Sequence, residues 1–173
     1  SVYNSSFIKE LVEKLSAQKE RLSSEQKLFD VLKNEAQKHD KQSFSDIEDE
    51  KNALKTMVTI CDDYLQKITQ TNSITKHYQK SFRSWQRKAK DQQKKLERED
   101  SIFNQSKSSY MFWKNNSPWQ SQKDERDAID KVFQNIQMHK DMVQMKRISS
   151  YHSEALKKIE DELKKRLEVL NKS

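Results

Sequence analysis

No glycine occurs among the 173 residues of this chain. Glycine adopts left-handed backbone conformations without a steric penalty, so its absence removes the easiest route to tight hairpins, phosphate-binding loops and dinucleotide-binding folds. The chain has one proline, and 32% of its residues are hydrophobic, which is too few for an ordinary globular core. β-sheet folds are therefore nearly excluded. Long helices with narrow hydrophobic stripes and a disordered chain are the two classes that remain.

The spacing of hydrophobic residues favours helices. A stripe with a seven-residue repeat predicts a first helix over about 6–38, and it comprises Ile8, Leu15, Leu22, Phe29 and Ala36. A second stripe runs from Phe44 to Phe103 and changes phase after Asn72, with no Pro or Gly between its two halves. We therefore predict one helix over about 44–110, roughly 100 Å long at 1.5 Å per residue, with a break near Asn72 as the alternative.

The segment Ser117-Pro118-Trp119-Gln120 has the pattern of a helix start. Ser117 is a suitable N-cap, Pro118 fits the first helical position, and Gln120 completes a capping box. We predict that the last helix runs over about 118–171.

These lengths predict an all-α fold in which 1–173 is a single helical module and a segment of a larger protein. Three long helices would form an elongated antiparallel coiled coil or helical bundle, and a break near Asn72 would make four. A long narrow stripe must be covered along its whole length, so we expect a homodimer or a helical protein partner. Four shorter helices could instead close as a monomeric bundle.

Positive charge is concentrated in one part of the chain. Between residues 76 and 98, nine basic residues face only two acids, Asp91 and Glu97, and nine minus two equals the formal net charge of the whole chain, +7. Most of the basic residues recur at intervals of three and four, opposite the hydrophobic stripe, and would form an outward row roughly 30 Å long. The predicted binding residues are Lys76, Lys80, Arg83, Arg87, Lys88, Lys90, Lys94, Lys95 and Arg98.

This row has three interpretations. It could be an ordinary solvated helix face, a contact for an anionic membrane or an acidic protein, or a sequence-independent contact for nucleic acid. Nucleic-acid binding is the less favoured of the binding interpretations, because the neighbouring aromatic residues belong to the hydrophobic stripe and could not stack on bases.

Large hydrophobic residues gather where the second and third helices meet. Local packing would fold Trp119 back on Tyr110 or Trp113 and close the hairpin. The alternative is a docking site for a partner or a membrane interface. The residues of this predicted site are Tyr110, Phe112, Trp113 and Trp119.

The sequence gives no support for catalysis, a metal site or a cofactor, and no small-molecule substrate is predicted. Cys61, the single cysteine, lies on the hydrophobic stripe and is expected to be a small buried thiol. One cysteine cannot form an internal disulfide, which favours a cytoplasmic location. The basic row would place the chain peripherally on membranes. Asn-x-Ser matches at Asn4, Asn104, Asn115 and Asn171 leave secretion open.

The segment Phe82-Arg83-Ser84-Trp85-Gln86-Arg87-Lys88, with the basic run after it, resembles the BAR-type modules of sorting nexins and related membrane-shaping proteins. The resemblance is one of layout: long kinked helices, dimerisation and a basic middle helix. It implies a curved dimer that binds anionic lipids through that face, although the predicted first helix is shorter than the family's. We therefore expect a non-enzymatic helical interaction module, with a purely structural coiled-coil spacer as the alternative.

Overall fold

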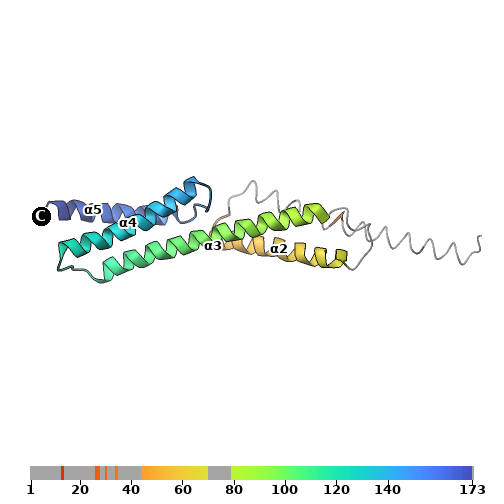
Figure 1. Ribbon diagram of the computed structural model, residues 1–173, viewed down its shortest axis with the longest axis horizontal. Helices are drawn as coiled ribbons and strands as arrows, with labels where there is room; N and C mark the ends of the chain where they lie inside the picture. Colours follow the sequence, from red (N-terminus) through yellow and green to blue (C-terminus); the bar gives the residue numbers. More distant parts are fainter. Residues whose placement is uncertain are drawn as a thin grey trace, which may run out of the picture. The chain divides into compact units, whose positions relative to one another are not determined.

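A computed structural model describes residues 44–69 and 79–172, together with five isolated positions nearer the N-terminus. The described residues form four helices, α2 (Ile47–Thr69), α3 (Gln79–Asn115), α4 (Gln122–Gln144) and α5 (Ser153–Asn171), and they contain no strand (Figure 1). The predicted all-α class is confirmed. The helix predicted over 6–38 lies outside the described residues except at those isolated positions.

The chain divides into two compact units, 1–91 and 92–173. Helix α3 contributes residues 79–91 to the first unit and 92–115 to the second. Each unit is described separately.

In the first unit, α2 and the beginning of α3 run antiparallel and side by side (Figure 1). Asp46 caps α2, since its carboxylate accepts a hydrogen bond from the Asp49 N–H at 2.9 Å. Cys61 and Phe82 are completely buried, and full burial of a phenylalanine side chain contributes roughly 1.5–3 kcal/mol. The expected buried position of Cys61 is confirmed.

The helix predicted over 44–110 is interrupted. The Gln86 side-chain amide donates a hydrogen bond to the Asp62 carboxylate. In one straight helix, these residues would be about 36 Å apart at 1.5 Å per residue. The prediction of one continuous helix is therefore wrong, and the alternative of two helices is correct. Asn72, the predicted break, lies outside the described residues.

In the second unit, the end of α3 packs with an antiparallel pair formed by α4 and α5 (Figure 1). The hydrophobic residues recur at intervals of three, four or seven along each helix, so each helix presents one apolar face. The buried core consists of Trp113, Ala128, Ile129, Val132, Ile136, Leu156, Leu163 and Leu170.

Helix α4 begins at Gln122 and not at Pro118. Ser121 is its N-cap, because the Ser121 hydroxyl accepts a hydrogen bond from the Asp124 N–H at 3.2 Å. Asp124 and Glu125 then place negative charge in the first turn, where it favours the helix N-terminus. The prediction that Ser117 caps this helix was wrong, since a better cap follows four residues later.

The helix predicted over 118–171 is also interrupted, because α4 ends at Gln144 and α5 begins at Ser153. The Lys146 N–H donates to the Val143 carbonyl at 3.0 Å, and the Arg147 N–H donates to the Met142 carbonyl at 2.9 Å. These two bonds form a Schellman motif, which ends a helix with one residue in the left-handed region. That residue is Lys146, with φ 58°.

Candidate functional site: the basic face of α3

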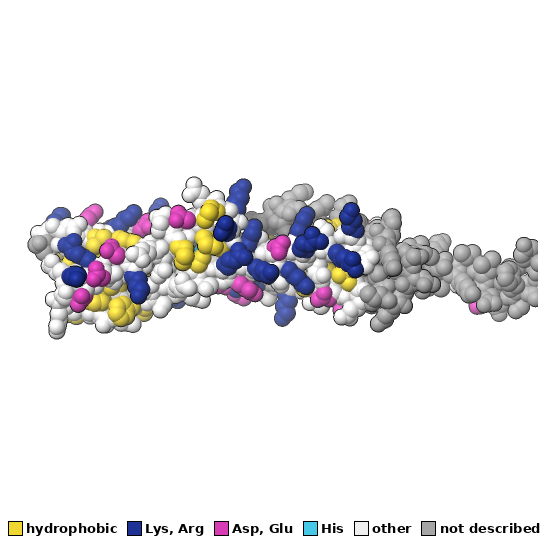
Figure 2. Space-filling view, viewed as in Figure 1, with side chains coloured by type: hydrophobic (Ala, Val, Ile, Leu, Met, Phe, Trp, Pro, Cys, Tyr) yellow, Lys and Arg dark blue, Asp and Glu magenta, His cyan; other side chains and the backbone are white. Residues whose placement is uncertain are grey.

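The predicted basic residues that the structure describes lie together on α3. We call them the basic face: Lys80, Arg83, Arg87, Lys88, Lys90, Lys94, Lys95 and Arg98. All are exposed except Lys95, which is half-buried, and Lys76 lies outside the described residues. Figure 2 shows lysine and arginine side chains gathered over this part of the chain. Phe82, Ala89 and Leu96 are buried, as expected for the opposite side of the helix.

None of the basic face residues forms an ion pair with a carboxylate in the described part of the chain. Other cations do have such partners, as in the pair between Lys140 and Glu160 at 2.7 Å. Like charges three or four residues apart destabilise a helix by roughly 0.2–0.5 kcal/mol per pair. The basic face is therefore a row of uncompensated charge, and the repulsion along it must be offset by the buried side of α3.

The loop between α4 and α5 adds two cations that the sequence analysis did not include. Lys146 and Arg147 are both exposed. Arg98 Nη1 donates to the Arg147 carbonyl at 3.5 Å, which places the loop beside the C-terminal end of the basic face. Only the unexpected end of α4 brings these residues together, so a prediction of one continuous helix could not find them.

Near this loop, an acidic side chain is completely buried. Glu99 accepts a hydrogen bond from the His152 backbone N–H at 3.1 Å, and Glu99 Oε2 lies 3.5 Å from His139 Nε2. His152 is the N-cap residue of α5, so Glu99 places a carboxylate at the positive end of that helix. The His152 ring also stacks on Phe103, with 4.0 Å between ring centroids, and contacts the Asp100 carboxylate at 2.7 Å. These contacts fix the start of α5 against α3.

The predicted aromatic site is largely used for packing within the second unit. Trp113 is buried, and Trp119 Nε1 donates to the Trp113 carbonyl at 3.0 Å. The Tyr110 hydroxyl donates to Glu162 at 2.5 Å, and burial, together with that carboxylate, raises the pKa of Tyr110 to about 12. Local packing therefore accounts for three of the four predicted residues.

A charged residue completes this packing. Glu125 is 2% exposed and accepts hydrogen bonds from Trp113 Nε1 at 2.9 Å and from Arg166 Nε and Nη2 at 2.8 Å each. The bonds from Arg166 hold the pKa of Glu125 below its usual value. This bidentate pair connects α3, α4 and α5, and the sequence analysis did not identify it.

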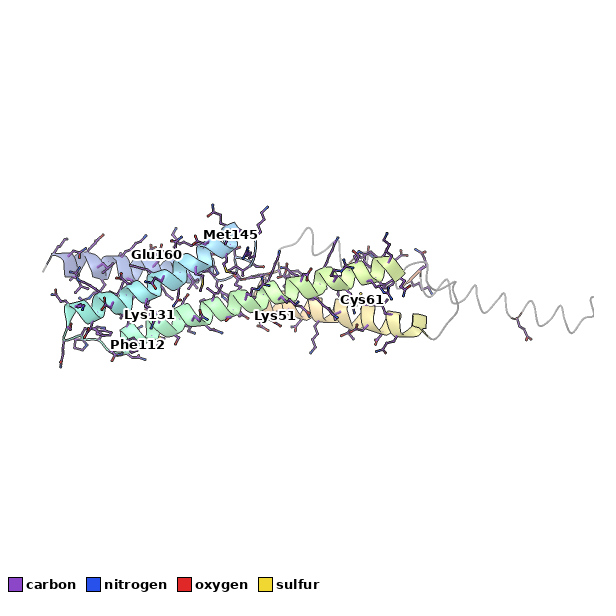
Figure 3. All side chains as sticks on the ribbon, in the orientation of Figure 1. Lys51, Cys61, Phe112, Lys131, Met145 and Glu160 are labelled. Carbon is purple, nitrogen blue, oxygen red and sulfur yellow. The ribbon has the colours of Figure 1, made fainter. Side chains whose placement is uncertain are left out.

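The fourth aromatic residue remains outside the core. Phe112 is 58% exposed, and its ring meets the Trp119 ring edge-on, with centroids 5.9 Å apart. It lines a shallow groove of about 270 Å³ together with Ser108, Ser109, Ala128 and Lys131, and Figure 3 labels Phe112 and Lys131. The predicted docking role is therefore reduced to the Phe112 side chain and its groove.

The described residues contain no group of three or more His, Cys, Asp or Glu side chains arranged to hold a metal ion. Cys61, labelled in Figure 3, has its pKa raised to about 11, first by burial and second by Asp62. None of the helices in 44–69 and 79–172 is long and apolar enough to be a candidate membrane span. No protein family, curated protein or solved structure matched this chain in the comparisons.

Proposed function

We propose that the chain is a non-enzymatic helical interaction module that docks the basic face of α3 on an anionic surface. The observation that carries this proposal is the row of exposed cations without ion-pair partners in the described residues. A solvated helix face that only maintains solubility would normally mix charges of both signs.

A membrane that contains anionic lipids is the partner that the basic face suits best. Each cation near such a surface contributes about 1 kcal/mol, and salt screens the attraction within a Debye length of about 8 Å at physiological ionic strength. A few cations together therefore give reversible, salt-dependent binding.

Nucleic acid fits the same residues less well. Binding to single strands gains much of its energy from aromatic side chains that stack on bases. The aromatic residues of this part of α3 are engaged with one another, since Phe82 is buried and meets the ring of Trp85 at 5.8 Å. Phosphate contacts alone would remain, so salt-sensitive binding to any nucleic acid sequence is the outcome that would favour this alternative.

Charge reversal tests the proposal. The test variant changes Lys80, Arg83, Arg87 and Lys90 to Glu. The control variant changes four exposed lysines of or next to α5, Lys157, Lys158, Lys165 and Lys172, to Glu, so that both variants alter the net charge equally. Circular dichroism checks that both variants fold, and co-sedimentation with phosphatidylserine-containing vesicles measures binding.

We expect the test variant to lose vesicle binding and the control variant to retain most of it. Equal loss in both variants would mean that only net charge matters, and the proposed face would be wrong. If the unaltered chain does not bind anionic vesicles, the membrane proposal fails and an acidic protein or a structural spacer role replaces it.

Homodimerisation is a separate proposal. It rests on the sequence stripe of Ile8, Leu15, Leu22, Phe29 and Ala36, because the stripe from Phe44 to Phe103 is divided between two helices. Light scattering on the purified chain measures it directly. A mass near twice 20.7 kDa is expected, and a mass of 20.7 kDa over a wide concentration range would contradict it.

A further inference from the structure

The loop between α4 and α5, residues 145–152, is held against α3 within the second unit. Gln92 Nε2 donates to Ser149 Oγ at 3.3 Å, and Arg98 Nη1 donates to the Arg147 carbonyl at 3.5 Å. At the end of the loop, the His152 N–H is bound by the buried carboxylate of Glu99. Three contacts spread along the loop fix the position of its backbone relative to α3.

This attachment gathers cations from two segments that are far apart in the sequence. Lys94 and Arg98 are one helical turn apart on α3, a spacing at which side chains are neighbours. Arg98 contacts the backbone of Arg147, and Lys146 is the adjacent residue. We call these four residues the loop cluster: Lys94, Arg98, Lys146 and Arg147.

The acids near the loop cluster do not pair with its cations. All four cations are exposed, and none forms an ion pair with a carboxylate among the described residues. Glu99 is buried and bonded to His152, and Asp100 contacts the His152 ring. Three exposed acids lie nearby in the sequence: Glu97 between Lys94 and Arg98, Asp91 three residues before Lys94, and Asp141 in the last turn of α4. None of them forms an ion pair with the four cations.

Lys146, one of the four cations of the loop cluster, has an unusual backbone conformation. Lys146 has φ 58° at the position of a Schellman motif that glycine usually occupies. A residue with a Cβ is disfavoured there, so Lys146 adopts a backbone conformation that glycine would adopt with less strain. The side chain projects from an end of α4 that the loop contacts hold in place.

We propose that the loop cluster binds a lipid headgroup that carries two phosphomonoesters, at the C-terminal end of the basic face. A phosphomonoester has a charge of about −1.5 to −2 at neutral pH, so two of them match four cations. Arginine guanidinium groups bind phosphate oxygens in a bidentate manner, whereas lysines supply point charges. This inference rests on the proposed function, because it assigns a lipid to one end of the face that approaches the membrane.

The test compares two kinds of vesicle with equal zeta potential. One contains phosphatidylserine, and the other contains a phosphatidylinositol bisphosphate. The variant Lys146→Gly, Arg147→Gln removes the two loop cations, and Lys157→Gln, Lys158→Gln is the matched control on α5. The general attraction of about 1 kcal/mol per cation is lost on both kinds of vesicle, which is roughly 30-fold for two cations. The loop variant is expected to lose more than this on the bisphosphate vesicles, because the direct contacts to the phosphomonoesters are lost as well.

Folding is tested separately. Lys146→Gly alone suits the left-handed position, so its melting temperature should equal or exceed that of the unaltered chain. Weaker binding without lower stability would then show that the side chain acts in binding. A fall in the melting temperature would contradict the argument from backbone conformation.

The remaining outcomes separate this inference from the proposed function. An equal loss on both kinds of vesicle, or a loss no larger than the control's, overturns the loop cluster as a headgroup site and leaves the basic face intact. No binding of the unaltered chain to either vesicle overturns both proposals. If soluble inositol bisphosphate binds as tightly as the vesicles do, a free phosphorylated solute replaces the lipid as the ligand.

Discussion

The contact between Glu125 and Arg166 gives the sharpest prediction about stability. Glu125→Gln keeps the size of the side chain and removes its charge. The Arg166 side chain is 40% exposed, so water screens the pair and lowers its contribution. Hydrogen bonds to charged groups contribute about 1.5–3 kcal/mol net, and we expect Glu125→Gln to destabilise the second unit by about 2 kcal/mol. Glu125→Ala should cost more, because the buried Trp113 N–H then loses its acceptor.

Urea unfolding followed by tryptophan fluorescence measures this change. A Trp85→Phe background confines the signal to Trp113 and Trp119, which both lie in the second unit. With a slope of about 1–3 kcal/mol per molar urea, the midpoint should fall by about 1 M. A double-mutant cycle with Arg166→Gln should give a coupling energy of at least about 1 kcal/mol.

Acid pH gives a second measurement of the same contact. The pKa of Glu125 is lowered in the folded chain, so its stabilising effect is present above the unfolded pKa, about 4.3, and is lost as the pH falls through the folded pKa. The free energy of unfolding of the unaltered chain should approach that of the Glu125→Gln variant in acid. The reasoning would be refuted if the free energies of unfolding of the unaltered chain and the Glu125→Gln variant differed by the same amount down to the lowest pH. A coupling energy between Glu125 and Arg166 near zero at neutral pH would refute it too.

Two further predictions concern titration. Because the pKa of Tyr110 is raised to about 12, ultraviolet titration of the folded chain should detect a late-ionising tyrosine, and Glu162→Gln should lower the pKa of that group. Ionisation of Tyr110 near pH 10 would contradict the contact. The stabilising effect of the neutral phenol should be complete below pH 10 and lost as the pH rises through about 12. The pKa of Cys61 is raised to about 11, so alkylation of the folded chain at pH 8 should be far slower than in urea; equal rates would mean that the thiol is not buried.

The hydrophobic pattern was enough to predict the all-α class and much of the described core, but not where the helices are interrupted. The stripe through Leu54 and Cys61 is buried, and so are Leu156 and Leu163 at a seven-residue spacing. These features depend on the spacing of residues along one helix, and that spacing can be read from the sequence. The outward position of the basic face is predictable for the same reason.

The ends of the helices were harder to predict. Lys146 ends α4 in a conformation that glycine usually marks, and a chain without glycine gives no such signal. At the other end of α4, Ser121 caps the helix although Ser117-Pro118 fits the usual pattern. The sequence pattern favoured Ser117 as the cap and gave no sign of a helix end near Lys146, so local composition missed both ends of α4.

The buried charged residues could not be predicted from local patterns. Glu99 resembles the exposed acids around it, and it is buried because His152, in a distant segment, provides its partner. Glu125 likewise depends on Arg166, which lies 41 residues away. Helical periodicity places residues on faces, but it does not say which faces meet.

The uncompensated charge of the basic face also has a consequence for the rate of encounter. Oriented charges raise association rates by about 10- to 1,000-fold when the partner has the opposite sign, and salt reduces this acceleration steeply. Neutralising one exposed cation of α3 should therefore slow arrival at an anionic surface. Contacts made after arrival, at the loop between α4 and α5, would govern the rate of departure. Mutation of Lys80 or Arg83 should then change mainly the rate of arrival, and mutation of Lys146 or Arg147 mainly the rate of departure, whereas Lys94 and Arg98 belong to both sets.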